Sequence, residues 1–453
     1  MLFELLSLLG GAASRPYAVP FILICFILYA IRLWSNGPRN PRNRNMHGRV
    51  VVITGGFSPL GLRLITELAK RGAQVIGLTP SLDDPVIDEL IHAIRAMTKN
   101  ELVYAEECDL DSPASIHSFC KQLVQLKPSL DGGSPAEPQR VDALIFAHEY
   151  SYIARSGSSP LADSAVSAEK ADERRLRPSL ASFLLTASIL PSLLRAPKDR
   201  DIRIIHVVNP FYAAAVPFFN PSSPSPALEL SVFAKEGYRS LRTVIYGRHL
   251  QRVLDAIARP KKDSAPAGKG GLVVPPKIPG ASNILSITVS PGFIAREAGD
   301  PLLSRFWNSP LSPLWLMRVI LYYVLVYPIV VILTKSTFFA VESILYMVFL
   351  PHPRKMLPAV DDAVGAHSNR EGDADRTVEG GKLYRDYTVV RLPGGAEESI
   401  MDNEGIGRAV WEHLEAGVQR WETEEAEILA QAVKNATAGS STLDPRVRND
   451  PDH

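Results

Sequence analysis

The chain has 453 residues, enough to bury a large core in one α/β domain with appendages or in two domains. Lys and Arg number 49 against 48 Asp and Glu, and this balance provides no global electrostatic field for binding nucleic acid. The three cysteines, Cys25, Cys108 and Cys120, lack metal-ligand spacing and are too few for a disulfide framework. We therefore expect no metal site, no nucleic-acid partner and a reducing compartment.

An apolar segment over residues 18–34 is the first predicted element, and its length is at the short end for a transmembrane anchor. A cleaved signal peptide is the alternative, but the segment lies far from the start and 33–36 is a poor cleavage site. Arginines are frequent after the segment, whereas Arg15 alone precedes it, so the positive-inside rule places the large C-terminal part in the cytosol. Residues 1–17 are a tail, and 35–47 an extended linker. The expected membrane is that of the endoplasmic reticulum or of a lipid droplet.

A βαβ unit follows the linker. Val50 to Thr54 is a β-branched run typical of a strand buried on both faces, and a glycine-containing turn covers residues 55–61. Apolar residues recur at helical spacing from Leu60 to Leu68, and Ala73 to Leu78 is a second buried strand. This order places the glycines where backbone N–H groups and a helix N-terminus can hold a pyrophosphate. A purely structural turn remains the alternative, because such turns alone are a weak signal.

Strands and helices alternate along the rest of the domain. We predict four more strands, over 101–108, 141–147, 202–208 and 284–290. Helices are expected after the capping residues Asp111 or Ser112, over 176–194 and over 230–258. Six strands alternating with helices predict an α/β fold with a Rossmann-type, doubly wound parallel sheet.

Several motifs can be matched to a known family. Residues 54–61 (Thr-Gly-Gly-Phe-Ser-Pro-Leu-Gly) are similar to the turn Thr-Gly-x-x-x-Gly-x-Gly, with Pro59 in place of the middle glycine. Further similar segments are Asp109–Leu110 after the third strand, 183–186 with 190–194, Pro291–Gly292, and 381–384. Together they resemble the short-chain dehydrogenases/reductases, in particular the membrane-bound retinol-dehydrogenase and hydroxysteroid-dehydrogenase type. The resemblance covers about residues 48 to 390, and the domain is expected over 48–358.

The resemblance implies a nicotinamide cofactor, NADP with NAD as the alternative. The second strand ends without an acidic group for a ribose hydroxyl and without an arginine for a 2′-phosphate, and Thr79 and Arg63 are the pointers to NADP. The implied cofactor-binding residues are Thr54, Gly55, Gly56, Ser58, Leu60, Gly61, Thr79, Asp109, Leu110, Ala147, Pro291 and Gly292.

The catalytic positions that the resemblance implies depart from the family pattern. In the family, a Tyr exchanges the proton, a Lys four residues on lowers its pKa, a Ser orients the substrate oxygen, and an Asn in the central helix supports a water relay. Here Tyr238 is followed by Arg242, the serine position holds Asn209, and the asparagine position holds Pro178, which donates nothing. Arg242 stays charged and is expected to lower the Tyr238 pKa, although its planar fork places donors differently.

Each catalytic candidate has an alternative. Tyr238 could be a helical tyrosine on the surface. Tyr246 is a rival, but Leu250 lies four residues after it and supplies no cation. His148 is either a substitute acid or base or a loop histidine without chemistry.

Residues 315–334 are apolar and have Pro328 within them. A second transmembrane span and an ordinary core helix are the alternatives to a hydrophobic lid helix that enters one leaflet beside the substrate opening, which we expect. Residues 359–379 are predicted to be a disordered loop, 380–435 a C-terminal extension with an amphipathic helix over 409–432, and 436–453 a disordered tail.

Two functions remain. The first is a membrane-anchored NAD(P)-dependent oxidoreductase acting on a hydroxyl or carbonyl of a lipid-like substrate. The second is a catalytically inactive relative that keeps the fold as a membrane scaffold or lipid-binding protein. Membrane lipids and a lipid-like small molecule are the expected partners, and a homodimer is left open.

Overall fold

The structure is a computed structural model. It describes residues 18–124, 140–151, 165–197, 199–220, 232–259, 282–294, 317, 320, 323–324, 327–352, 377–395 and 397–440. The predicted tail 1–17, most of the predicted loop 359–379 and part of the apolar segment 315–334 lie outside the described residues.

An eight-stranded sheet forms the centre of the domain, in the order β3-β2-β1-β4-β5-β6-β7-β8. All six predicted strands are present: β1 (Val50–Thr54), β2 (Gln74–Thr79), β3 (Val103–Glu107), β4 (Ala143–Phe146), β5 (Ile202–Val207) and β6 (Ile284–Val289). They pair in parallel, and the register between β1 and β4 runs from Val51 opposite Ala143 to Thr54 opposite Phe146. The expected α/β fold with a mostly parallel, Rossmann-like sheet is confirmed.

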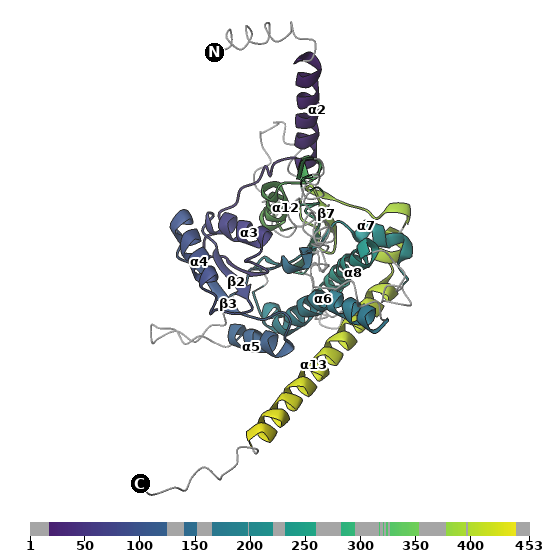
Figure 1. The fold of residues 1–453 in the computed structure, drawn as a ribbon. Coiled ribbons are helices and arrows are strands. Elements are labelled where there is room, and N and C mark those ends of the chain that lie inside the picture. The colour runs from purple at the N-terminus through teal and green to yellow at the C-terminus, as the bar shows by residue number, and fades with distance from the viewer. Residues whose placement is uncertain are drawn as a thin grey trace, which may run out of the picture.

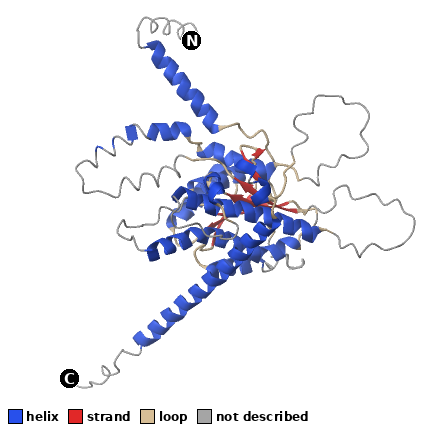
Figure 2. Cartoon of the chain, turned by 90° about the vertical axis from the view of Figure 1, so that its right-hand side faces the viewer, coloured by secondary structure: helices blue, strands red, loops and turns tan. Residues whose placement is uncertain are grey.

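Helices cover both faces of the sheet, and Figure 2 shows the strands enclosed between them. Alternate residues of β1 enter two separate cores, Val50 and Val52 one, Val51 and Ile53 the other. The second core is closed by α3 (Pro59–Ala69), α4 (Pro85–Thr98) and α12 (Thr337–Phe349). The first core is closed by α5 (Pro113–Val124), α6 (Ala165–Leu194), α8 (Val232–Ala258) and α13 (Glu404–Ser440), as Figure 1 shows.

The last helix, α13, packs against α8 and α6 with its first half. Its buried side chains on that face are Ile406, Val410, Leu414, Val418 and Trp421. Glu422 and Glu425 still bond to His117 and Ser112 at α5, and beyond them the helix projects from the domain (Figure 1), with Ile428 and Leu429 exposed. The predicted amphipathic helix over 409–432 is therefore present. It continues to Ser440, further than the start of the predicted tail at residue 436.

The structure differs from the predicted helices and strands in three other places. Helix α4 was not predicted; it begins with Pro85 after the cap Asp84, whose Oδ1 accepts a hydrogen bond from Val86 N. Helix α6 begins at Ala165, ahead of the predicted residue 176. Two further strands, β7 (Leu383–Arg385) and β8 (Thr388–Val389), extend the sheet, so part of the predicted C-terminal extension belongs to it.

The two added strands form a tight hairpin. β7 pairs in parallel with β6, and β8 returns antiparallel. The connecting residues Asp386 and Tyr387 have positive φ values of 48° and 68°. Both lie in the left-handed region that a two-residue turn of this kind requires and that favours glycine or asparagine. These strands are too short for alternation to reveal them in the sequence.

The segment predicted as a linker has no helix or strand over residues 37–46, and it is packed against the domain. It leaves helix α2 (Ala18–Asn36), whose last residue Asn36 accepts a hydrogen bond from Ser336 N. Asn43 Oδ1 then accepts from Arg71 Nε at 3.0 Å, and Met46, which is buried, donates from its backbone N to Arg71 O at 2.9 Å. The segment therefore runs as a strap from α2 to β1.

Candidate active site

The order of the strands marks one edge of the sheet as the place for a ligand. The order reverses between β1 and β4, and open α/β sheets bind ligands at the carboxyl ends of the strands at such a point. Most of the predicted site residues end one of the strands β1 to β6 or follow it closely, and they therefore gather at this edge. They are Thr54 to Gly61, Thr79, Asp109, Leu110, Ala147, Asn209, Pro291 and Gly292.

The turn between β1 and α3 is built around glycines. Gly55 has a φ of +64°, and a Cβ atom there would lie 2.8 Å from His148 N. A Cβ atom on Gly61 would overlap the carbonyl oxygen of Gly55. Helix α3 thus approaches the end of β1 as closely as the backbone allows, which is the packing that dinucleotide-binding turns use.

The same turn carries fewer phosphate donors than the family motif. Ser58 is the N-cap of α3, and its Oγ accepts a hydrogen bond from Gly61 N at 3.1 Å. Pro59 occupies the first helical position, where its ring is tolerated but no N–H is available. The turn therefore fits a pyrophosphate in shape, with Ser58 and Pro59 reducing the number of backbone donors that face it.

The residues expected to bind the adenine and its ribose lie at the ends of β2 and β3. Thr79 Oγ1 donates to Ser81 O at 3.0 Å, and Asp109 Oδ1 accepts from Asp111 N at 2.9 Å. Arg63, which the sequence offered as a pointer to NADP, does not support that choice. Its guanidinium pairs with Glu67 at 3.4 Å and lies over the Phe338 ring of α12.

Tyr238 lies on α8 and is 1% exposed, so the alternative of a surface tyrosine is wrong. Its hydroxyl accepts from Asn220 N at 3.2 Å and donates to Asn220 O at 3.3 Å. Burial raises the pKa of Tyr238, and the nearby Arg242, 5.8 Å from the ring centroid, lowers it by less. The expected effect of Arg242 has the right sign but does not prevail, so the phenol is protonated at neutral pH.

Asn209, after β5, is held by a buried network that the sequence did not reveal. Its Nδ2 donates to Glu236 Oε1 at 3.0 Å, and its Oδ1 accepts from Ser240 Oγ at 2.7 Å. Arg239 pairs with Glu236 and donates to Ser151 O at 3.0 Å. Because the amide oxygen is directed to Ser240, Asn209 can offer a substrate only an N–H.

His148 is held in one tautomer by its neighbours. The carbonyl of Pro178 lies 3.1 Å from Nε2 and can only accept, so Nε2 carries the proton. Nδ1 then accepts from Thr54 Oγ1 at 2.6 Å. Burial lowers the pKa of His148, which keeps the ring neutral. This arrangement favours the loop histidine without chemistry over the substitute acid or base.

A second buried pair lies behind His148. Glu149 and His206 are 3.5 Å apart, and the Phe146 ring stacks on His206 at 4.8 Å between centroids. Burial acts to raise the Glu149 pKa, but the adjacent His206 outweighs it and lowers the pKa. Tyr246, the rival tyrosine, packs in the core against His206, with 5.5 Å between the centroids of the two rings.

The loop after β6 is clamped from two sides. Tyr150 donates to Gly292 O at 2.6 Å and accepts from Ile294 N at 3.0 Å. On the other side Lys335 N donates to Phe293 O at 2.7 Å, and the Lys335 ammonium pairs with Asp386. Sequence reasoning missed both clamps, because Tyr150 and Lys335 are each more than 40 residues from the loop in the chain and only the fold brings them to it.

Comparison with known proteins identifies relatives of the chain. It is 27% identical over 369 residues to an uncharacterized oxidoreductase of Saccharomyces cerevisiae. The aligned region covers 76% of this chain and 79% of that protein. A second uncharacterized oxidoreductase, of Schizosaccharomyces pombe, is 27% identical over 51% of this chain and 58% of its own length. Retinol dehydrogenase 14 of Mus musculus is 34% identical over 28% of this chain and 38% of its own length. The chain is therefore similar to proteins named as oxidoreductases and retinol dehydrogenases. The resemblance stated from its motifs is confirmed.

No family model matches the chain. Among solved structures, an uncharacterized protein from Mycobacterium paratuberculosis aligns with a TM-score of 0.44 and 18% identity, over 84% of this chain and 98% of that one. An actinorhodin polyketide ketoreductase with NADPH aligns with a TM-score of 0.40 and 16% identity, over 66% and 89%. The chain matches the Schizosaccharomyces pombe oxidoreductase and the mouse retinol dehydrogenase over about three fifths of their length or less.

Proposed function

We propose that the chain is a membrane-anchored, NADP-dependent oxidoreductase that acts on a carbonyl or hydroxyl of a lipid-like substrate. The observation that carries the proposal is the glycine turn at the point where the strand order reverses, where Gly61 packs directly on Gly55. The oxidoreductase names of the relatives support the same class of reaction.

The residues that would hold the cofactor follow from the geometry of this edge. The turn 54–61 would hold the pyrophosphate, Asp109 and Leu110 the adenine, and Pro291 with Gly292 would border the nicotinamide. When bound, the nicotinamide supplies or accepts a hydride. At the end of β2, Thr79 replaces the acidic residue that would repel a 2′-phosphate, which favours NADP.

The chain's own groups would handle the proton. The Tyr238 hydroxyl, kept protonated by burial, would donate to the substrate oxygen, and Arg242 would stabilise the phenolate left behind. The substrate oxygen would replace the Asn220 backbone as the partner of the hydroxyl, and the two bonds to be exchanged are long. Asn209 would donate an N–H to the same oxygen.

A scaffold without activity is the second candidate, and a specific observation favours it. Both ends of the Asn209 amide and the Tyr238 hydroxyl are engaged by groups of the protein itself. Such a protein would keep the fold and lose the reaction, because no group would be presented to the substrate.

NADPH binding, measured by saturable quenching of tryptophan fluorescence, separates the two candidates. We expect saturation at submillimolar NADPH. We also expect a loss of affinity of about tenfold or more for Gly61→Ala, because the added Cβ displaces α3 from β1. Gly405→Ala is the matched control, since the nearest atom to its Cβ is Asn403 Oδ1 at 3.2 Å, on the surface. Absence of quenching at millimolar NADPH would leave the scaffold.

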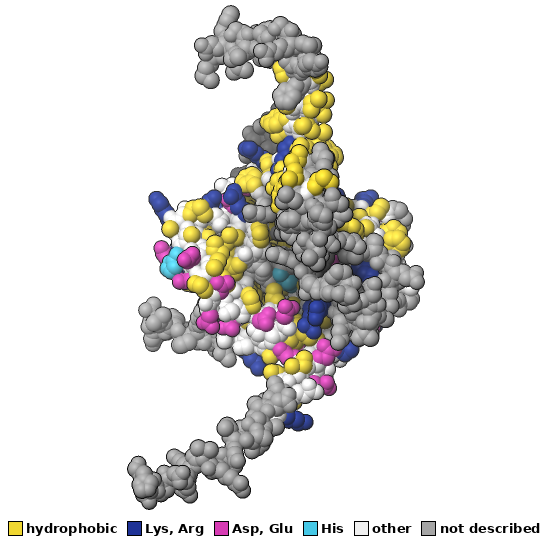
Figure 3. Space-filling view, viewed as in Figure 1, with side chains coloured by type: hydrophobic (Ala, Val, Ile, Leu, Met, Phe, Trp, Pro, Cys, Tyr) yellow, Lys and Arg dark blue, Asp and Glu magenta, His cyan; other side chains and the backbone are white. Residues whose placement is uncertain are grey.

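Membrane attachment is supported by two helices that meet outside the domain. Helix α2 projects from it (Figure 1) and shows an apolar surface in Figure 3. Helix α11 (Tyr327–Leu333) packs beside α2, with Arg32 donating to Val331 O and Ser35 Oγ to Leu333 O at 2.7 Å. The exposed apolar side chains on α2 and on the described part of residues 315–334, which contains α11, are Ile22, Leu23, Ile24, Phe26, Ile27, Leu28, Tyr29, Leu33, Trp34, Met317, Ile320, Tyr323, Val324, Tyr327, Ile329 and Leu333.

Length and apolarity alone would select another helix. Among the described residues, the one stretch that is long and apolar enough to cross a bilayer is Arg174–Leu194, and 56% of it is buried inside the protein as part of α6. It is a core helix by its packing. The exposed apolar side chains of α2 and α11, and not mean hydropathy, therefore favour these two helices as the membrane contacts.

Removal of residues 1–35 is expected to leave part of the protein bound to membranes, because α11 and its exposed side chains remain. Cosedimentation with phosphatidylcholine vesicles measures the bound fraction. Ile329→Asp and Leu333→Asp in the shortened chain should release it. If the shortened protein without these substitutions were monodisperse and free of vesicles, α11 would not contact lipid.

A further inference from the structure

The amino-terminal edge of the sheet, opposite the candidate active site, carries two buried carboxylates. Asp201 precedes β5 and Asp142 precedes β4, and the side chain of each is 1% exposed. Burial acts to raise the Asp201 pKa, but Arg203 outweighs it and holds the pKa at about 2. The five arginines that pair with the two carboxylates are Arg44 and Arg203 at Asp201 and Arg49, Arg140 and Arg200 at Asp142.

The charges of this group do not cancel. Five guanidinium groups face two carboxylates in the ion pairs of the described residues. Burial and then the charge of Arg44 lower the pKa of Arg49. A cationic edge of this kind attracts an anion.

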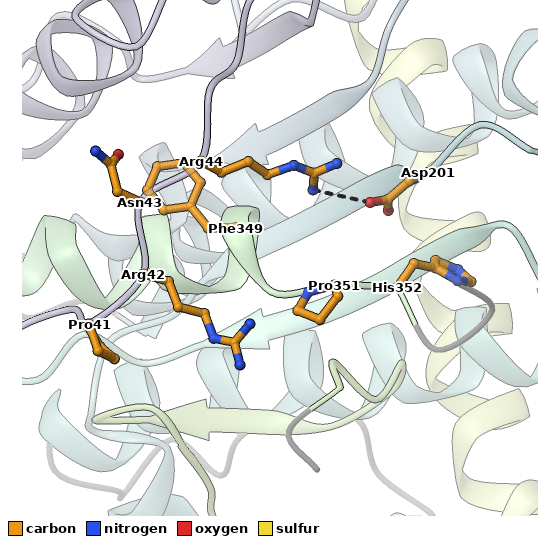
Figure 4. Close-up of a pocket in the computed structure, with 8 residues that line it drawn as sticks. All are labelled: Pro41, Arg42, Asn43, Arg44, Asp201, Phe349, Pro351 and His352. Carbon is orange, nitrogen blue, oxygen red and sulfur yellow. Dashed lines mark hydrogen bonds and ion pairs between the residues drawn. The ribbon is translucent and has the colours of Figure 1, made fainter. Parts of the chain in front are cut away.

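A cavity of about 390 Å³ opens beside this group. Figure 4 shows that the strap and the end of α12 line it from two sides, with Asp201 at one end. The lining residues are Pro41, Arg42, Asn43, Arg44, Asp201, Phe349, Pro351 and His352. Guanidinium, amide and imidazole groups thus share the cavity with the Asp201 carboxylate and an apolar wall.

Arg44 is the residue that could turn to a ligand at little cost. Its bond to Asp201 is long, at 3.4 Å, and its side chain is 27% exposed. Asp201 would not be left unpaired, because Arg203 binds both of its carboxylate oxygens at 3.1 and 2.8 Å. Arg44 is therefore available for a second anion.

We propose that this cavity is a binding site for a phosphate monoester, with the phosphate on Arg44 and the organic part against Phe349 and Pro351. The planar fork of arginine matches phosphate with two parallel hydrogen bonds. The cavity is larger than a phosphate alone requires, and the apolar wall explains the remaining space. A bound ligand would fasten the strap to the end of α12.

The phosphate could belong to a soluble ester or to the headgroup of a phosphorylated lipid. Titration of the full chain in detergent with inorganic phosphate and with phenyl phosphate, at constant ionic strength, tests the site itself. Phenyl phosphate is expected to bind more tightly than inorganic phosphate. The same titration in nanodiscs with phosphatidylinositol 4-phosphate tests the source, because a headgroup in the cavity would weaken phenyl phosphate binding by about tenfold or more. An unchanged affinity there assigns the site to a soluble ester.

Arg44→Gln is expected to weaken phenyl phosphate binding by about tenfold or more, because a charge-assisted pair is lost. Arg44→Lys keeps the charge but not the planar fork, so its affinity for phenyl phosphate should lie between those of Arg44→Gln and the unaltered protein. Arg408→Gln removes an arginine from an exposed pair on α13 and is the control, with no change expected. The proposal is overturned if the unaltered protein binds neither probe up to about 10 mM. Equal affinity of Arg44→Gln and the unaltered protein would also overturn it.

Discussion

Replacement of Tyr238 by phenylalanine is expected to lower the rate of carbonyl reduction by about two to four powers of ten, the usual worth of general acid catalysis. Only one oxygen atom is removed, and its two bonds to the Asn220 backbone are long, so stability should change little. NADPH affinity should also stay the same. Single-turnover reduction of a lipid-like ketone, followed by NADPH absorbance, measures the effect.

Tyr246→Phe is the matched control for this experiment. It removes the same oxygen from the same helix, but Tyr246 is buried in the core against His206, about two helical turns after Tyr238. Arg242→Lys should hold or raise the activity, because it restores the family's residue beside the phenol. If Tyr238→Phe kept full activity, the assignment of the proton donor to Tyr238 would be wrong.

Replacement of Arg239 by methionine is expected to lower the free energy of unfolding by about 3–5 kcal/mol. Arg239 and Glu236 are both buried, and without the guanidinium the Glu236 carboxylate would remain charged in the core with Asn209 as its described partner. The midpoint of urea unfolding, with the slope compared between variants, measures the loss.

The control for this change is Arg408→Met on the surface of α13. Arg408 pairs with Glu412 one helical turn away, and the two side chains are 76% and 60% exposed. Its loss should cost less than about 0.5 kcal/mol. Adding Glu236→Gln to Arg239→Met should recover part of the stability, since the stranded charge is removed. Equal midpoints for Arg239→Met and Arg408→Met would show that Glu236 is stabilised by other means.

The elements that could be predicted were those with strong local patterns. The β-branched run of β1 and the glycines of the turn give their positions directly, because buried parallel strands and close helix–strand packing each require particular residues. β7 and β8 are too short for a periodic signal. The hairpin they form is also joined by Asp386 and Tyr387, which do not have the usual composition of such a turn.

The site residues that were missed share a different cause. Glu236 and Arg239, three residues apart on a helix, have the spacing of an exposed ion pair, and nothing in the sequence shows that the fold buries them. Tyr150 and Lys335 reach the loop after β6 from distant parts of the chain. Burial and long-range contact are properties of the assembled sheet, which a local pattern does not contain.

The position of α13 has a consequence for the order in which the protein matures. The face of α6 and α8 that Leu414, Val418 and Trp421 cover stays open to water until the ribosome has released this last helix. The nascent chain therefore carries this apolar surface from the completion of α8 until α13 has been made, and such surfaces attract chaperones or promote aggregation. A premature stop before residue 404 would remove the helix that closes this core, leaving a protein for quality control to degrade.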